Sequence, residues 1–304
     1  MISSDIFYQF IDWRHDQIDP SENFDHDGTL TSIIMVPKVT IGLSDWWNIN
    51  FQQVIGRRHM TWGPDNKSTH HREEGSHSNF LNALGGYLGD TKIIFRYLLQ
   101  NVGRGEGSRI IIGGGLIIPS KNTLIRSPFD LEVDEQGNLN YIEHRHFSMS
   151  EGVFKGQFEL QYYYKKIKNP VFLGGTLRFM EPLSENKYGF SGSRLTELSL
   201  SALFNKKNPL KTPISTNIVF SQEKEAFWNG EAAPNSKSIT ITPGIGFFFD
   251  SDFASISLNI QKPYYLNSAL SEDIGTDHDE EAHTWQVSIS IRKILDYTIP
   301  WLYW

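Results

Sequence analysis

The chain has 304 residues, of which 39% are hydrophobic, 21% charged and 13% aromatic, and it contains no cysteine. The lack of thiols excludes disulfides and thiolate metal sites. The net charge of -7, with no basic stripe, argues against a nucleic-acid partner. No apolar run reaches the roughly 18 residues of a membrane-spanning helix.

The first ten residues, MISSDIFYQF, lack a basic region followed by an apolar segment. Two readings therefore stay open. Either the protein remains inside the cell, or a signal has been removed before Met1.

Alternation of apolar and polar residues dominates the chain and predicts β-strands, because successive side chains of a strand point to opposite faces. The regularity is weakest in the first, second and fifth of the predicted strands. The twelve predicted strands are 6–13, 29–41, 45–60, 91–102, 108–119, 153–166, 171–181, 194–204, 213–221, 237–249, 254–262 and 283–294.

The stretch from Gly85 to Asn122 is organised as a hairpin. Thr91 to Gln100 alternates, three glycines between positions 103 and 107 supply a turn, and 108–119 returns. Gly113 to Gly115 lie within the return strand, which indicates a bend or close packing, since no helix follows to cradle a phosphate.

The connections alternate between long and short along the whole chain, so an up-and-down meander would place all long loops at one end of the strands. An even strand count, long loops on one rim and an apolar face opposite a polar face are typical of outer-membrane barrels. The sequence thus predicts an all-β, antiparallel, up-and-down transmembrane β-barrel of about twelve strands. We expect a single domain over 1–304, with long rim loops at 62–90 and 120–152 and a C-terminal aromatic tail at 295–304.

Aromatic residues stand at predicted strand ends, for example Trp46 and Trp47 before one strand and Tyr162 to Tyr164 at the end of another. Such positions match the interfacial girdles of membrane barrels. The alternative is a soluble sandwich with these rings in its core, which would need a second layer to cover the apolar face. The chain closes on Trp304, similar to the terminal aromatic of many outer-membrane barrels, although Pro300 departs from that pattern.

Three short motifs carry a resemblance to a known family: Leu88-Gly89-Asp90, Arg96-Tyr97-Leu98-Leu99 and Ile117-Ile118-Pro119-Ser120. In these motifs the chain resembles the outer-membrane family labelled as transporters or as "MetA-pathway of phenol degradation" proteins. The match spans about forty residues. The resemblance implies a twelve-strand-type barrel, placement in the bacterial outer membrane and a role in transport.

Histidines cluster in the two long predicted loops, together with carboxylates. Imidazole and carboxylate ligands suit zinc or copper, although no spacing matches a structural zinc signature. The alternative is an ordinary polar surface loop. The candidate metal ligands are His70, His71, Glu74, His77, His144 and His146.

Two acidic loop segments form a second group of candidates, which could hold calcium. Neither has the spacing of a twelve-residue calcium loop, so a solvated surface is the alternative. The carboxylates are Asp130, Glu132, Asp134, Glu135, Asp277, Asp279, Glu280 and Glu281.

The polar faces of the predicted strands would point into the barrel and carry charges of both signs. Such charges could line a narrow wet path or pair across the lumen and close it. The candidate lumen-lining residues are Lys92, Arg96, Lys155, Glu159, Lys165, Arg178, Glu197 and Arg292.

These patterns predict an outer-membrane channel or transporter for a small solute, in contact with outer-membrane lipid. The alternative is a barrel without transport, serving in metal capture, adhesion or as a scaffold. An enzyme is not expected, because Ser148 and Ser150 near two histidines lack the Gly-x-Ser-x-Gly elbow of hydrolases. A homo-oligomer or a subunit of a membrane complex is left open.

Overall fold

A computed structural model describes residues 1–15, 26–62, 74–75, 80, 82–83, 85–103, 105–127, 131–133, 139–141, 148–205, 212–233, 236–267 and 281–297. Within these ranges one antiparallel sheet contains 14 strands, of which β4 and β18 lie off the main ring, so twelve strands form the ring. None of the residues in these ranges forms a helix long and apolar enough to cross a membrane.

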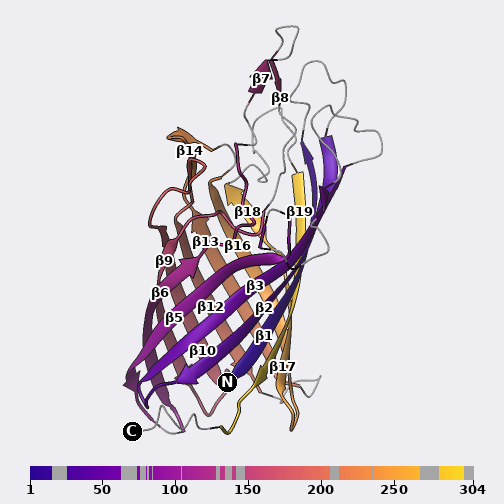
Figure 1. Ribbon diagram of the computed structural model, residues 1–304. Helices are drawn as coiled ribbons and strands as arrows, with labels where there is room; N and C mark the ends of the chain where they lie inside the picture. Colours follow the sequence, from indigo (N-terminus) through magenta and orange to yellow (C-terminus); the bar gives the residue numbers. More distant parts are fainter. Residues whose placement is uncertain are drawn as a thin grey trace.

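The ring strands run in chain order, each beside its sequence neighbour (Figure 1). They are β1 (Ile2–His15), β2 (His26–Gly42), β3 (Trp47–Trp62), β5 (Leu88–Asn101), β6 (Gly107–Ile118), β9 (Lys155–Lys165), β10 (Phe172–Pro182), β12 (Leu195–Phe204), β13 (Ile214–Glu223), β16 (Ser238–Asp250), β17 (Ser255–Gln261) and β19 (Glu281–Lys293).

The barrel closes where the first strand meets the last. β1 pairs with β19 from Ile2 opposite Lys293 to Arg14 opposite Glu281. The predicted fold is therefore confirmed: an antiparallel, up-and-down barrel of twelve strands. Strand β1 begins four residues earlier than predicted, because Ser4 interrupts the alternation on its outward face while its backbone still pairs with Ile291.

The barrel has an apolar exterior and a polar interior. Along β9, Phe158 and Leu160 are 49% and 38% exposed, whereas Glu159 and Gln161 are 1% and 8% exposed. The same inversion holds around the ring, where large apolar side chains are exposed and many buried side chains are polar. So large an apolar surface is stable only against lipid, as in outer-membrane barrels.

The long connections emerge at one end of the barrel and the short turns at the other, as the alternating loop lengths predict (Figure 1). The N-terminus lies at the short-turn end. The long-loop end carries the short strands β4 (Glu74–Gly75), β7 (Leu131–Val133), β8 (Leu139–Tyr141), β11 (Phe190–Ser191), β14 (Phe227–Trp228), β15 (Glu231–Ala232) and β18 (Tyr264–Asn267). Of the predicted aromatic tail, residues 295–297 follow β19 without regular structure, and 298–304 lie outside the described residues.

Exposed aromatic rings stand near both ends of the strands. At the short-turn end the Trp47 and Tyr97 ring centroids are 4.7 Å apart. At the long-loop end the Lys262 ammonium lies 5.6 Å from the Tyr264 ring and 5.1 Å from the Trp285 ring. Amphipathic rings in these two positions match the aromatic girdles of a membrane barrel.

Candidate functional site

The lumen encloses a cavity of about 400 Å³ lined by residues of eight ring strands and by the N-terminal residue. Six of the eight predicted lumen residues line this cavity: Lys92, Arg96, Glu159, Arg178, Glu197 and Arg292. The other two do not. Lys155 lies at the start of β9, nearer the long loops, and Lys165 is exposed at the end of that strand.

Four of the charged lining residues belong to one hydrogen-bonding row that crosses neighbouring strands. Arg96 of β5 is opposite Gly113, Gly113 is opposite Glu159, Glu159 is opposite Arg178, and Arg178 is opposite Glu197. We call these five residues the balanced row, since its cations and carboxylates alternate. Such neighbours can neutralise one another without crossing the lumen.

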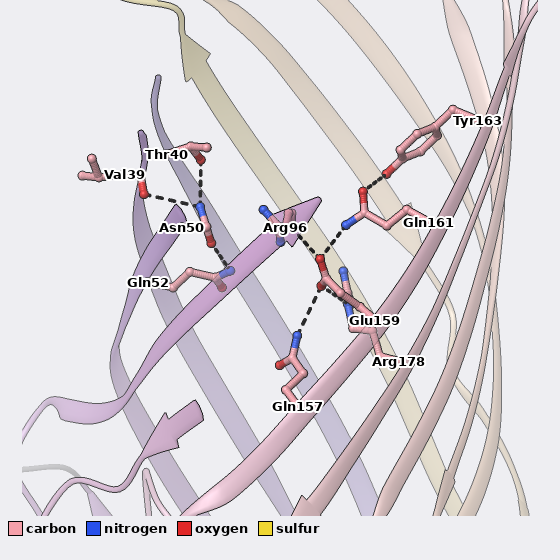
Figure 2. A network of polar contacts seen from close by, with 10 residues as sticks. All are labelled: Val39, Thr40, Asn50, Gln52, Arg96, Gln157, Glu159, Gln161, Tyr163 and Arg178. Carbon is pink, nitrogen blue, oxygen red and sulfur yellow. Dashed lines mark hydrogen bonds and ion pairs between the residues drawn. The ribbon is translucent and has the colours of Figure 1, made fainter. Parts of the chain in front are cut away.

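Glu159 is the centre of a hydrogen-bonding network on the lumen wall (Figure 2). The Arg96 guanidinium donates to its Oε1 and the Gln161 amide donates to the same oxygen over 2.8 Å. The Gln157 amide donates to Oε2 over 3.3 Å, and Arg178 Nε lies 4.0 Å from that oxygen. Arg178 also forms an ion pair with Glu197. A carboxylate that is 1% exposed needs such partners to stay charged.

Gly113 makes room for the ion pair that spans it. A Cβ atom there would lie 2.8 Å from Glu159 Cγ and 3.2 Å from Arg96 Cγ. Since Gly113 stands between these residues in the balanced row, only a residue without a side chain leaves space for their contact. The sequence-based expectation of close packing at the three glycines applies to this position.

Several lining residues were not among those predicted from the sequence. The Lys38 ammonium forms an ion pair with Asp5. Asn50 donates to Val39 O over 3.5 Å and to Thr40 Oγ1 over 2.8 Å (Figure 2). These residues lie on β1, β2 and the start of β3. In an alternating strand Lys38 would fall on the inward face, which could have indicated a lumen position. However, the apolar Val36 on the same face and the neighbouring Pro37 obscure the alternation.

The segment 148–154 folds against the inner wall at the long-loop end. A Cβ on the inward-facing Gly56 would lie 2.3 Å from Met149 Cε, and the Arg58 guanidinium donates to Ser148 O over 3.0 Å. Lys155 Nζ lies 2.6 Å from Glu151 and donates to Ser193 O over 3.2 Å. This segment therefore lies between the cavity and the outer loops.

Ser148 and Ser150 make hydrogen bonds within their own loop. Ser148 Oγ donates to Ser150 O over 2.7 Å, and Ser150 Oγ accepts the Gly152 amide over 2.9 Å. His144 and His146 lie outside the described residues. These contacts give both hydroxyls a structural role in the loop.

The predicted metal ligands His70, His71, His77, His144 and His146 lie outside the described residues. Glu74 is described only as backbone, paired with Met60 of β3. Among the residues that the structure describes, no group of three or more His, Asp or Glu side chains could hold a metal ion.

For the candidate calcium-binding carboxylates, too, the structure describes no side chain. Asp130, Asp134, Glu135, Asp277, Asp279 and Glu280 lie outside the described residues, and Glu132 and Glu281 are described only as backbone. Both ion-binding hypotheses therefore stay predictions.

No family model and no curated protein matches this chain. Among solved structures it is similar to the COG4313 outer membrane channel from Pseudomonas putida F1, with a TM-score of 0.53, 12% identity and coverage of 96% of this chain and 95% of that one. It is also similar to the deltaS2 mutant of the TodX monoaromatic hydrocarbon channel, with a TM-score of 0.46, 8% identity and coverage of 97% and 90%. The first likeness shows the fold: this is a β-barrel of the bacterial outer-membrane type.

Proposed function

We propose that this protein is an outer-membrane channel or transporter for a small solute. The observation that supports the proposal is a charged, polar cavity inside a barrel whose outer face suits lipid. Lys92 lines this cavity with no carboxylate oxygen of the described residues within ion-pair distance, and such a charge is costly in a protein interior unless a wet path compensates it.

Conductance in a planar lipid bilayer tests this proposal. Purified barrel, checked for folding by heat-modifiable gel mobility, should produce discrete current steps, and the same preparation unfolded by heating should produce none. A folded barrel that gives no current under any voltage would contradict the channel function.

A barrel without transport is the second candidate, and one observation favours it. Described parts of three long connections pack together at the long-loop end, where Ala226, Trp228 and Ala233 contact Leu124, Tyr188 and Phe190. Loop segments with an apolar cluster of their own can present a fixed surface to a partner, which suits adhesion or a scaffold. Folded protein without conductance would favour this candidate.

Metal capture by the histidine loops remains part of that second candidate. Neutral imidazoles bind zinc or copper at pH 7 and lose them as pH falls through about 6.5. Calorimetry should detect binding of either ion at neutral pH and its loss when His70, His71 and His77 are changed together to Ala. Wild-type protein that gives no heat with both ions would end this hypothesis.

A further inference from the structure

A second hydrogen-bonding row in the lumen carries a positive residue on every second strand. Beginning at β19, Arg292 is opposite Ser3 of β1, Ser3 is opposite Lys38 of β2, and Lys38 is opposite Gln52 of β3. The row continues from Gln52 to Lys92 of β5, to Ile117 of β6 and to Lys155 of β9. We call these seven residues the cationic row, because its four charged members are all Lys or Arg.

The cationic row connects the two ends of the barrel. Rows run across the strands, and barrel strands tilt by about 35–45°, so a row climbs along the axis as it passes around the wall. Arg292 lies one residue from the end of β19 at the short-turn end, whereas Lys155 begins β9 at the long-loop end. The row is thus a rising spiral of positive charge.

The distance between the cations of this row is short enough for a small ion to interact with two of them at once. Neighbouring strands are about 4.8 Å apart, so cations on every second strand stand roughly 10 Å from one another. A small ion midway between two such cations lies about 5 Å from each, which is within the distance of about 8 Å over which salt screens a charge at physiological ionic strength. The ion therefore feels both positive potentials as it passes from one side chain to the next.

Carboxylates neutralise only part of this charge. Lys38 pairs with Asp5, and Lys155 pairs with Glu151. Within the described part of the chain, Lys92 and Arg292 have no carboxylate oxygen within ion-pair distance, although both line the cavity. In the balanced row the two cations are matched by two carboxylates. The whole cavity lining contains more cationic than anionic side chains: Lys38, Lys92, Arg96, Arg178 and Arg292 against Asp5, Glu159 and Glu197.

We propose that the cationic row is an anion path and that the solutes of this channel are small anions, carrying a carboxylate or a phosphate group. The inference rests on the proposed channel function and adds the substrate class. Arg292, Ser3, Lys38, Gln52 and Lys92 all line the cavity, so an anion can exchange one ammonium or guanidinium partner for the next. Ser3 and Gln52, between the charges, offer hydrogen-bond donors.

Reversal potentials in a potassium chloride gradient test the path. The wild-type channel should pass chloride in preference to potassium. Lys92→Gln and Arg292→Gln should each lower the chloride permeability by roughly fourfold, the factor for one unit charge about 5 Å from an ion in water-like surroundings, and raise the potassium permeability by a similar factor. The chloride-to-potassium permeability ratio should therefore fall by roughly an order of magnitude. Inorganic phosphate should reduce the chloride current of the wild type more than that of either variant.

Lys293→Gln is the matched control, because Lys293 follows Arg292 directly and faces outward, with its ammonium 3.9 Å from the Phe253 ring centroid. It removes the same charge from the lipid side and should leave the ratio unchanged. Open channels that prefer potassium, or equal ratios for all three variants, would overturn the anion path while leaving the channel function intact. A folded wild type without conductance would overturn both.

Discussion

Glu159 is the residue on which most lumen contacts converge, so its removal should cost stability. Glu159→Ala leaves the partly buried Arg96 guanidinium without its carboxylate partner. We expect a loss of about 1–3 kcal/mol in the free energy of unfolding, the usual cost of a buried group left without its partner. Urea titration followed by tryptophan fluorescence in lipid vesicles measures this loss.

The control is an ion pair at the surface. Glu181 pairs with Arg194, and both side chains are at least half exposed. Because exposed pairs contribute little, Glu181→Ala should shift the urea midpoint much less. Equal shifts for the two variants would show that the Glu159 network does not stabilise the barrel.

Gly113 offers a second test at the same scale. Gly113→Ala would push against Glu159 and Arg96, and we expect a loss of about 1–3 kcal/mol from overpacking. Gly114→Ala, one residue along, places its Cβ 3.7 Å from the nearest atom, Gln157 O, and should be tolerated. Identical unfolding curves for the two variants would disprove that Gly113 is needed to leave room for the contact between Arg96 and Glu159.

At the scale of the strand, inward and outward faces should respond differently to the same charge. Leu200 lies near the middle of β12 and is 46% exposed, on the lipid side. Leu200→Arg should cost about 2–4 kcal/mol of stability near the bilayer midplane, whereas Ser199→Arg, facing the lumen, should cost much less. Unfolding in vesicles compares the two, and equal losses would refute the assignment of faces.

The sequence predicts strands to the extent that their alternation is clean. In β9 the period of two is unbroken, so its faces and most of its lumen residues could be assigned directly. In β2 the outward Pro37 and the inward Val36 blur the pattern, so Lys38 and its partner Asp5 were missed. Period alone tells which face a residue is on, but not which residue of the next strand stands opposite. The two rows therefore required the structure.

The long loops lie beyond sequence-based prediction for another reason. Residues 148–154 have no period to read, and their position depends on contacts with distant partners such as Gly56 and Asn186. Asn186 Nδ2 donates to Glu151 O over 3.1 Å. Such long-range pairs have no local signature, and only the length and polarity of the loops could be predicted.

At the scale of the whole molecule, closure between β1 and β19 can be tested with introduced cysteines, since the chain has none. Ile6 is opposite Ile289, and directly opposed Cα atoms lie about 4.5–5.5 Å apart, within reach of a disulfide. Ile6→Cys combined with Ile289→Cys should cross-link on oxidation, as peptide mapping by mass spectrometry would detect.

The control pairs Ile6→Cys with Trp285→Cys, which lies four residues before Ile289 on β19. The added distance of roughly 13 Å exceeds the reach of a disulfide in a folded barrel. Cross-links of equal yield in both variants would mean that β1 and β19 do not hold the register described above.

The balanced row has a consequence for how the barrel folds. A slip of two residues between neighbouring strands keeps every apolar side chain facing lipid, so the alternation of apolar and polar residues cannot tell the correct register from a slipped one. The charged residues of the lumen do distinguish the two. Moving β10 by two positions against β9 would place Arg178 opposite Gln157 or Gln161 in place of Glu159. The lumen charges then act as a proofreading device during assembly, because only one alignment of the strands leaves every ion pair matched.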